Sequence, residues 1–199
     1  DMNKLIAISF AALSILFAPA FTYAEDVNNG QDITRPLARL DTSYEYQLTA
    51  KDHAENTFTL RTDRPFIMAP GWKIVTRADV PCVLTNKITA GETGKVFDFG
   101  LGDILAQILL VRCEGDLWAF AGGAQLIFPT AGTDQMGNGK YQVVPTFGIR
   151  RMLPEISKGS FIGGLVRYAA DYAGPASRQH ISTLEMSPSL NINLPGDWF

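Results

Sequence analysis

The feature that most constrains the fold is an alternation of apolar and polar residues near the end of the chain. It runs from His180 to Leu194. The even positions are His180, Ser182, Leu184, Met186, Pro188, Leu190, Ile192 and Leu194. The odd positions are Ile181, Thr183, Glu185, Ser187, Ser189, Asn191 and Asn193. A period of two belongs to a β-strand and not to a helix. The segment therefore predicts a long strand with one apolar face and one polar face.

Three earlier segments alternate in the same way, and four more are weaker strand candidates. The clear ones are Leu117–Phe128, Tyr141–Met152 and Phe161–Tyr172. The weaker ones are Ser43–Ala50, Thr57–Thr62, Trp72–Leu84 and Asp98–Arg112. The clear strands are near or above ten residues, whereas strands in soluble proteins average about five or six. Aromatic residues also lie near strand ends, as in the interfacial girdles of membrane barrels. We expect an all-β fold, an antiparallel up-and-down transmembrane β-barrel with about eight strands.

The N-terminus has the pattern of a secretory signal peptide. Lys4 precedes the apolar run Leu5–Phe21, and Thr22-Tyr23-Ala24 offers small residues for cleavage after Ala24. We therefore divide the chain into a signal peptide (1–24), a polar N-terminal segment (25–41) and a β-barrel domain (42–199). Export in this form predicts a location in the outer membrane.

The lengths of the connections predict a topology. Residues 85–97 and 129–139 form long connections, whereas 113–116 and 153–159 are short. Long connections of outer-membrane barrels are usually extracellular and short ones periplasmic. The assignments alternate along the chain, except that the short connection 173–177 falls on the extracellular side.

Composition and motifs narrow the function classes. The net charge is −3, charged residues make up 19% of the chain, and Lys and Arg are scattered. Because nucleic-acid binding needs a basic stripe, we expect no nucleic-acid partner. The chain has no nucleotide-binding, hydrolase or zinc motif, so we expect no cofactor, no metal and no enzymatic activity. The expected partners are outer-membrane lipid, the outer-membrane insertion machinery and a small-molecule solute whose identity stays open.

Two cysteines, Cys82 and Cys113, are present. An exported chain enters an oxidising compartment, which allows a disulfide between them. The alternative is two separate thiols in the barrel wall.

The alternation also assigns polar residues to the lumen. The candidates are Arg77, Gln125, Gln142, Arg150, Arg167, Asp171 and Glu185. Charges on an inner wall can set the selectivity of a channel. In a narrow barrel they can equally pair with one another and fill the interior.

His180 and Ser182 lie on one face of the last predicted strand. The pair resembles the His-x-Ser pair of outer-membrane lipid A deacylases, in which a histidine activates a serine and a carboxylate orients the histidine. Glu185 falls on the opposite face, so the third member is missing. We keep an enzyme of this type, and a structural or adhesive barrel without transport, as alternatives to a transporter.

Five short motifs occur in order along roughly residues 60–199. They are Gly71-Trp72 with Thr76-Arg77 and Pro81, Phe99-Gly100-Leu101-Gly102-Asp103-Ile104, Phe128–Thr133 with Gly137–Tyr141, Ala173-Gly174 with Arg178, and Pro188 with Leu194–Trp198. Together they resemble the outer-membrane transporter family of the phenol meta-degradation pathway. The resemblance implies an outer-membrane β-barrel and passive, porin-like passage of small hydrophobic or aromatic compounds. It supplies no catalytic residues.

One departure from the family concerns the end of the chain. Family members continue for several strands past the last motif, whereas this chain stops at Phe199. Pro195-Gly196-Asp197 also breaks the alternation just before it. We therefore expect a truncated barrel.

Overall fold

The computed structural model describes residues 34–49, 53–86 and 97–193 as one antiparallel sheet of nine strands. The strands are β1 (Arg39–Thr49), β2 (His53–Ala69), β3 (Trp72–Thr85), β4 (Asp98–Leu101), β5 (Ile104–Glu114), β6 (Trp118–Phe128), β7 (Tyr141–Met152), β8 (Phe161–Ala173) and β9 (Ser182–Asn191). The proposed signal peptide, the polar segment up to residue 33 and the Pro195–Phe199 element lie outside the described residues.

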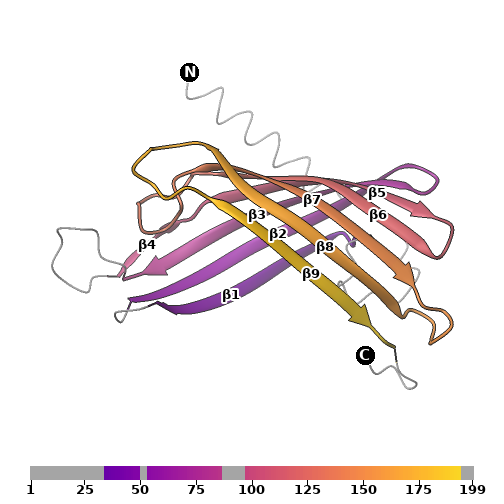
Figure 1. Ribbon diagram of the computed structural model, residues 1–199. Helices are drawn as coiled ribbons and strands as arrows, with labels where there is room; N and C mark the ends of the chain where they lie inside the picture. Colours follow the sequence, from indigo (N-terminus) through magenta and orange to yellow (C-terminus); the bar gives the residue numbers. More distant parts are fainter. Residues whose placement is uncertain (1–33, 50–52, 87–96, 194–199) are drawn as a thin grey trace.

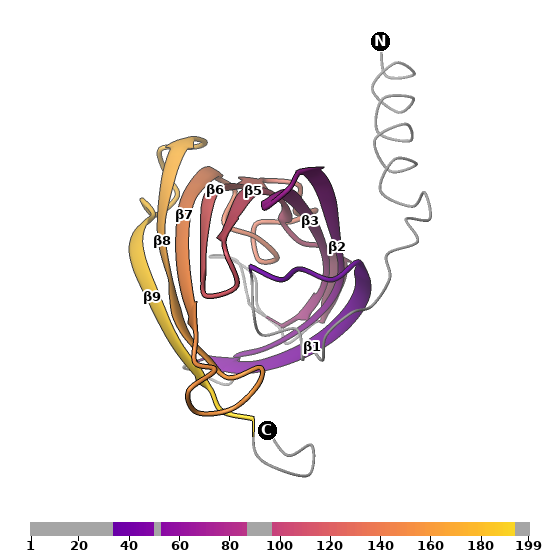
Figure 2. The same ribbon diagram turned by 90° about the vertical axis from the view of Figure 1, so that its right-hand side faces the viewer.

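The sheet is strongly curled into a half-barrel (Figures 1 and 2). Each long strand pairs with the next one along the chain, from β1 at one edge to β9 at the other, and β4 adds a short pairing to β3. Consecutive long strands therefore run up and down. This confirms the predicted all-β, antiparallel barrel class. No helix in the described part of the chain is long and apolar enough to cross a lipid bilayer.

The two faces of the sheet differ as the alternation predicts. In β7 the odd positions from Tyr141 to Ile149 are exposed or half-buried, and the even positions from Gln142 to Arg150 are buried. The burial lies on the concave side, because nothing in the described chain covers the convex side (Figure 2). The sheet is thus a single layer whose outer face carries exposed apolar side chains.

The expected continuous strand over Asp98–Arg112 is instead two strands, β4 and β5. Leu101 is opposite Cys82 and Leu105 is opposite Asp79, so four steps on one side match three on β3. The extra residue is a β-bulge, and it exchanges the faces of the residues on either side. Gly102 lies at this bulge, where an added Cβ would come within 3.0 Å of the Pro81 side chain.

The connections separate into two ends of the half-barrel. Residues 129–140 and 174–181 connect strands at one end, and residues 70–71, 115–117 and 153–160 connect strands at the other (Figure 1). The β8–β9 connection is longer than the predicted 173–177, because β9 begins only at Ser182. The connection after β8, which is short in the sequence prediction, is therefore a longer loop at the same end as the 129–140 loop.

Two adjacent glycines of β6 give a test of the sheet packing. A Cβ on Gly123 would lie 2.1 Å from the backbone oxygen of Ile108 in β5, whereas a Cβ on Gly122 would meet nothing within 4 Å. Gly123→Ala should lower the free energy of unfolding by roughly 2–3 kcal/mol, because backbone must move to admit the methyl group. Gly122→Ala should change it by less than about 0.5 kcal/mol. Urea unfolding of the refolded protein measures both, and equal effects would contradict this packing.

Candidate functional site on the concave face

An Arg-x-Asp sequence occurs on each of the first three strands. The three copies are Arg39-Leu40-Asp41 in β1, Arg61-Thr62-Asp63 in β2 and Arg77-Ala78-Asp79 in β3. Antiparallel pairing places every arginine opposite an aspartate of a neighbouring strand. The six side chains therefore form a two-by-three charge checkerboard, in which each charge has opposite charges beside it both along and across the strands.

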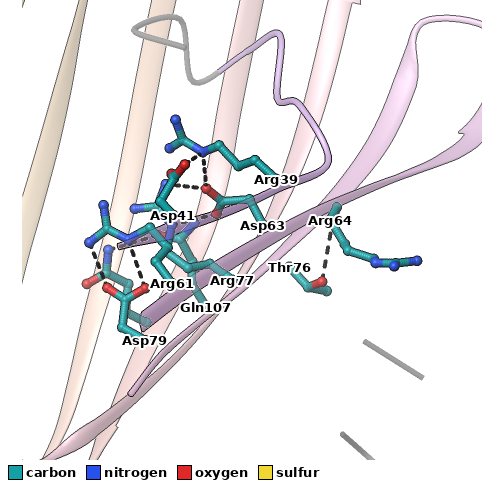
Figure 3. Close-up of polar contacts among 10 residues, drawn as sticks. Arg39, Asp41, Arg61, Asp63, Arg64, Thr76, Arg77, Asp79 and Gln107 are labelled. Atoms are coloured by element: carbon teal, nitrogen blue, oxygen red, sulfur yellow. Dashed lines mark hydrogen bonds and ion pairs between the residues drawn. The ribbon is translucent and has the colours of Figure 1, made fainter. Parts of the chain in front are cut away.

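Asp63 is the centre of this charge checkerboard. One carboxylate oxygen accepts a hydrogen bond from Arg39 Nε at 2.7 Å, and the other accepts one from Arg77 Nε at 2.7 Å. Its side chain is only 4% exposed. Figure 3 shows the two guanidinium groups approaching the Asp63 carboxylate from both neighbouring strands. A carboxylate buried in this way is stable only because charged donors replace its water.

The second row of the checkerboard is held by Arg61. Its Nε and Nη2 donate to the two carboxylate oxygens of Asp79 at 2.9 and 2.7 Å, which is the bidentate geometry of a strong Arg–carboxylate pair. Asp41 lies 2.9 Å from Arg39 Nε and is more exposed than Asp63 or Asp79.

Two glutamines extend the first row beyond β3. Gln107 of β5 is the cross-strand partner of Arg77, and it accepts a 2.8 Å hydrogen bond from Gln125 Nε2 of β6. Both glutamines are buried. The polar row thus crosses five neighbouring strands of the wall, from Arg39 to Gln125.

The opposite part of the wall carries two more arginines. Arg167 Nη1 donates to Glu185 at 3.0 Å across β8 and β9. Arg150 of β7 is 4% exposed, and its cross-strand neighbours on the concave face are Ala119 and Gly163. Small neighbours leave room for the long arginine side chain against the wall.

The long-loop end has its own polar cluster around Asp171. The Asp171 carboxylate accepts hydrogen bonds from Lys140 Nζ at 2.9 Å and from the Ile181 backbone at 2.8 Å. His180 Nδ1 lies 2.5 Å from the same carboxylate. Asp171 therefore ties the start of β7 and the β8–β9 loop to the end of β8.

Asp103, at the β-bulge, organises the loop between β6 and β7. Its carboxylate accepts hydrogen bonds from the backbone of Ala131 at 3.2 Å and of Asn138 at 2.6 Å. A Cβ on Gly137 would meet this same carboxylate. Arg178 pairs with Asp134 and covers Gly139. Three of the motifs quoted for the family resemblance, those around Asp103, Gly137 and Arg178, thus meet at one rim and fix its loops.

The predicted lumen residues all come from concave-face positions, but only some of them meet. Arg167 and Glu185 form a pair. Arg77, Gln125 and Asp171 have partners that the alternation did not single out, namely Asp63, Gln107 and Lys140. Gln142 is buried, and its Nε2 has no hydrogen-bond partner among the described residues. The repeated Arg-x-Asp sequence is the signal by which the checkerboard could have been found.

The disulfide between Cys82 and Cys113 does not form, and both residues are free thiols. Cys82 lies on the convex face opposite Phe58, whereas Cys113 packs on the concave face against Val111 and its neighbours. Cys113 adjoins Gly71 at the start of β3, so eleven residues of strand, roughly 36 Å, separate it from Cys82. Two thiols on opposite faces at this distance cannot be bridged.

Comparisons with protein-family models, with curated proteins and with solved structures find no match for this chain. Within the described ranges, no group of three or more His, Cys, Asp or Glu side chains is placed to hold a metal ion.

The checkerboard predicts unequal effects for two aspartate substitutions. Asp63→Asn leaves two guanidinium groups facing a neutral amide in a buried position and should cost about 2–4 kcal/mol of unfolding free energy. Asp41→Asn removes an exposed partner and should cost less than about 1 kcal/mol. Urea unfolding of the refolded variants measures both values.

A charge reversal separates a checkerboard from a set of independent pairs. If Arg61 and Asp79 formed an isolated pair, the double change Arg61→Asp with Asp79→Arg would restore most of the stability lost by Arg61→Asp alone. In the checkerboard the new carboxylate lies beside Asp41 and Asp63, and the new guanidinium lies beside Arg77. We expect the double variant to remain as unstable as the single one, and recovery would show that the rows do not interact.

Proposed function

We propose that the protein is an outer-membrane, porin-like transporter for the passive passage of small hydrophobic or aromatic compounds, exported by a cleaved signal peptide. The observation that carries this proposal is the reversed polarity of the sheet. Apolar side chains are exposed on the convex face, while charged and amide side chains line the concave one.

The convex face exposes large apolar residues on every long strand. They are Leu40, Tyr44, Tyr46 and Leu48 of β1, Phe58, Leu60 and Phe66 of β2, Trp72 and Leu84 of β3, Ile108 and Leu110 of β5, Trp118 and Leu126 of β6, Tyr141, Phe147 and Ile149 of β7, Ile162, Val166, Tyr168 and Tyr172 of β8, and Leu184, Met186 and Leu190 of β9. Soluble proteins rarely expose contiguous apolar patches larger than a few hundred Å². Hydrocarbon is the solvent that such a face fits.

Aromatic residues mark both ends of this face. Trp72 and Trp118 begin β3 and β6 at the short-turn end. Tyr141 and Tyr172 pack against each other at the long-loop end, with ring centroids 6.0 Å apart. Tryptophan and tyrosine concentrate where a barrel crosses the two membrane interfaces. The hydrophobic or aromatic nature of the solute rests on the family resemblance alone.

Two neighbouring residues of β9 test the membrane location. Met186 is exposed on the convex face, and Ser187 lies on the concave face beside Glu185. Met186→Arg should lower stability in lipid vesicles by about 2–4 kcal/mol, because it places a charge in hydrocarbon. Ser187→Arg should be tolerated. In a soluble protein an arginine at the exposed position 186 would be harmless as well, so equal tolerance at the two positions counts against a bilayer.

Transport itself is tested by conductance across planar bilayers and by solute uptake into vesicles that contain the refolded chain. Discrete conductance steps and uptake of a small neutral aromatic compound support passage. A barrel with a filled interior, serving adhesion or structure alone, inserts in the same way but passes no ions and no solute.

One observation favours a second candidate, an ester hydrolase acting on lipid. The carboxylate missing from the His-x-Ser pattern is supplied by Asp171, which contacts His180 Nδ1. An orienting carboxylate on this nitrogen is the arrangement of a Ser-His-Asp triad. The Ser182 hydroxyl, however, pairs with Tyr168 at 2.8 Å, and the described residues include no hydrogen bond between His180 and Ser182.

Ser182→Ala decides between the two candidates. For a transporter, the variant leaves both solute uptake and the acyl pattern of lipid A in the same cells unchanged. For a hydrolase, the acyl chains released by the wild-type protein disappear while uptake stays as it was. Mass spectrometry of lipid A provides the readout, with Thr183→Ala on the adjacent position as the matched control.

A further inference from the structure

A cavity opens on the concave face beneath the segment that precedes β1. Its lining combines charged, polar and apolar residues, among them Arg39, Asp63, Arg77, Leu109, Leu165 and Arg167. Pro36 and Leu37 of the preceding segment also line it. In Figure 2 this segment crosses the inner side of the half-barrel. The cavity thus lies between β1, β2, β3 and β5 on one side and β7 and β8 on the other.

One cross-strand row explains why the wall is hollow here. The row runs Val75, Leu109, Gly123, Thr146 and Arg167, from β3 to β8. Gly123 has no side chain and Thr146 a short one, so little projects from the middle of the row. An apolar end at Val75 and Leu109 and a cationic end at Arg167 therefore face the same space.

Arginines outnumber carboxylates among the described residues that line this cavity. The lining includes the arginines Arg35, Arg39, Arg77 and Arg167 and the carboxylate of Asp63. Asp41 and Glu185, which pair with Arg39 and Arg167, do not line it. A concave, partly dehydrated surface with such an excess concentrates anions.

Hydrogen-bond donors also remain available there. Arg167 bonds to Glu185 through Nη1, while its Nε is buried without a partner among the described residues. Among the described residues, the ion pairs of Arg39 with Asp41 and Asp63 run through Nε. Each guanidinium has five N–H donors, so both side chains keep donors for an acceptor that enters the cavity.

We infer that this cavity binds a small organic carboxylate with an apolar body. The carboxylate accepts hydrogen bonds from Arg167 and Arg39, because guanidinium groups match its planar geometry. The apolar body lies against Val75, Leu109 and Leu165. As a statement about the solute that passes, this inference rests on the proposed transport function. As a binding site it is independent of transport.

Calorimetry on the full chain refolded in detergent micelles tests the site, with benzoate as the probe. We expect benzoate to bind, and benzyl alcohol and benzyltrimethylammonium, which lack the carboxylate, to bind at least about tenfold more weakly. Acetate, which lacks the apolar body, should also be weaker. Binding of inorganic phosphate as tight as that of benzoate would contradict a role for the apolar wall.

Arg167→Gln should weaken benzoate binding about 10- to 100-fold, the usual range for a lost hydrogen bond to a charged group. The matched control is Arg151→Gln, which removes a guanidinium paired with Glu155 outside the cavity and should bind benzoate as the wild type does. Arg167→Lys retains the charge and should keep part of the affinity. Electrophoretic heat-modifiability confirms that each variant is folded, and if the glutamine variant does not fold, the lysine variant and the neutral probes still decide.

Vesicle uptake distinguishes the two proposals. Benzoate binding without uptake would refute the transport of this ligand, but it would still support the binding site. Uptake of neutral aromatic compounds without benzoate binding would refute the binding site, but it would still support transport. Equal binding of benzoate to the wild type and to Arg167→Gln would falsify the assignment of this arginine.

Discussion

Cross-strand register is the constraint on which the rest of this structure depends. The described chain is a single sheet, so no second layer corrects a side chain that points the wrong way. A slip of one residue would turn every apolar side chain of a strand into the lumen. A slip of two residues would keep the faces but would place arginine opposite arginine in one direction, and aspartate opposite aspartate in the other, in the checkerboard of β1, β2 and β3. The alternation therefore fixes the face, and the charges fix the pairing.

The alternation predicted the later strands well because each carries its own signal. Tyr141–Met152 agrees with β7 at both ends, and Phe161–Tyr172 is one residue short of β8. The earlier strands came out too short. Thr57–Thr62 stops where Asp63, Arg64 and Pro65 resemble a turn, yet β2 continues to Ala69. Asp63 remains in the strand because Arg39 and Arg77 neutralise it from both sides, and those partners lie 24 and 14 residues away.

The same limit applies to the candidate site. The lumen residues could be assigned to a face from their own strands, but their partners could not be assigned without the register. The Gly-Leu-Gly-Asp motif illustrates this most clearly. Its position near a strand was visible in the sequence, whereas the role of Asp103 depends on backbone amides 28 and 35 residues away. Local pattern reports which face a residue occupies, and only pairing reports what it contacts.

Pairing also decides where hydrogen-bond donors on the concave face stay available to a ligand. Along β1 to β3 the six charges of the checkerboard pair with one another within the wall, while Arg39 and Arg77 also line the cavity. Arg167 is engaged at one nitrogen only: the carboxylate of Glu185 accepts from Nη1, while the buried Nε has no acceptor among the described residues. Leu109 of β5 and Val75 of β3 lie in the same cross-strand row as Arg167, and only Gly123 and the short Thr146 lie between them and Arg167. The proposed carboxylate site therefore depends on a buried Arg167 N–H that has no acceptor among the described residues and that lies in one row with an apolar surface, and not on the number of charges on the concave face.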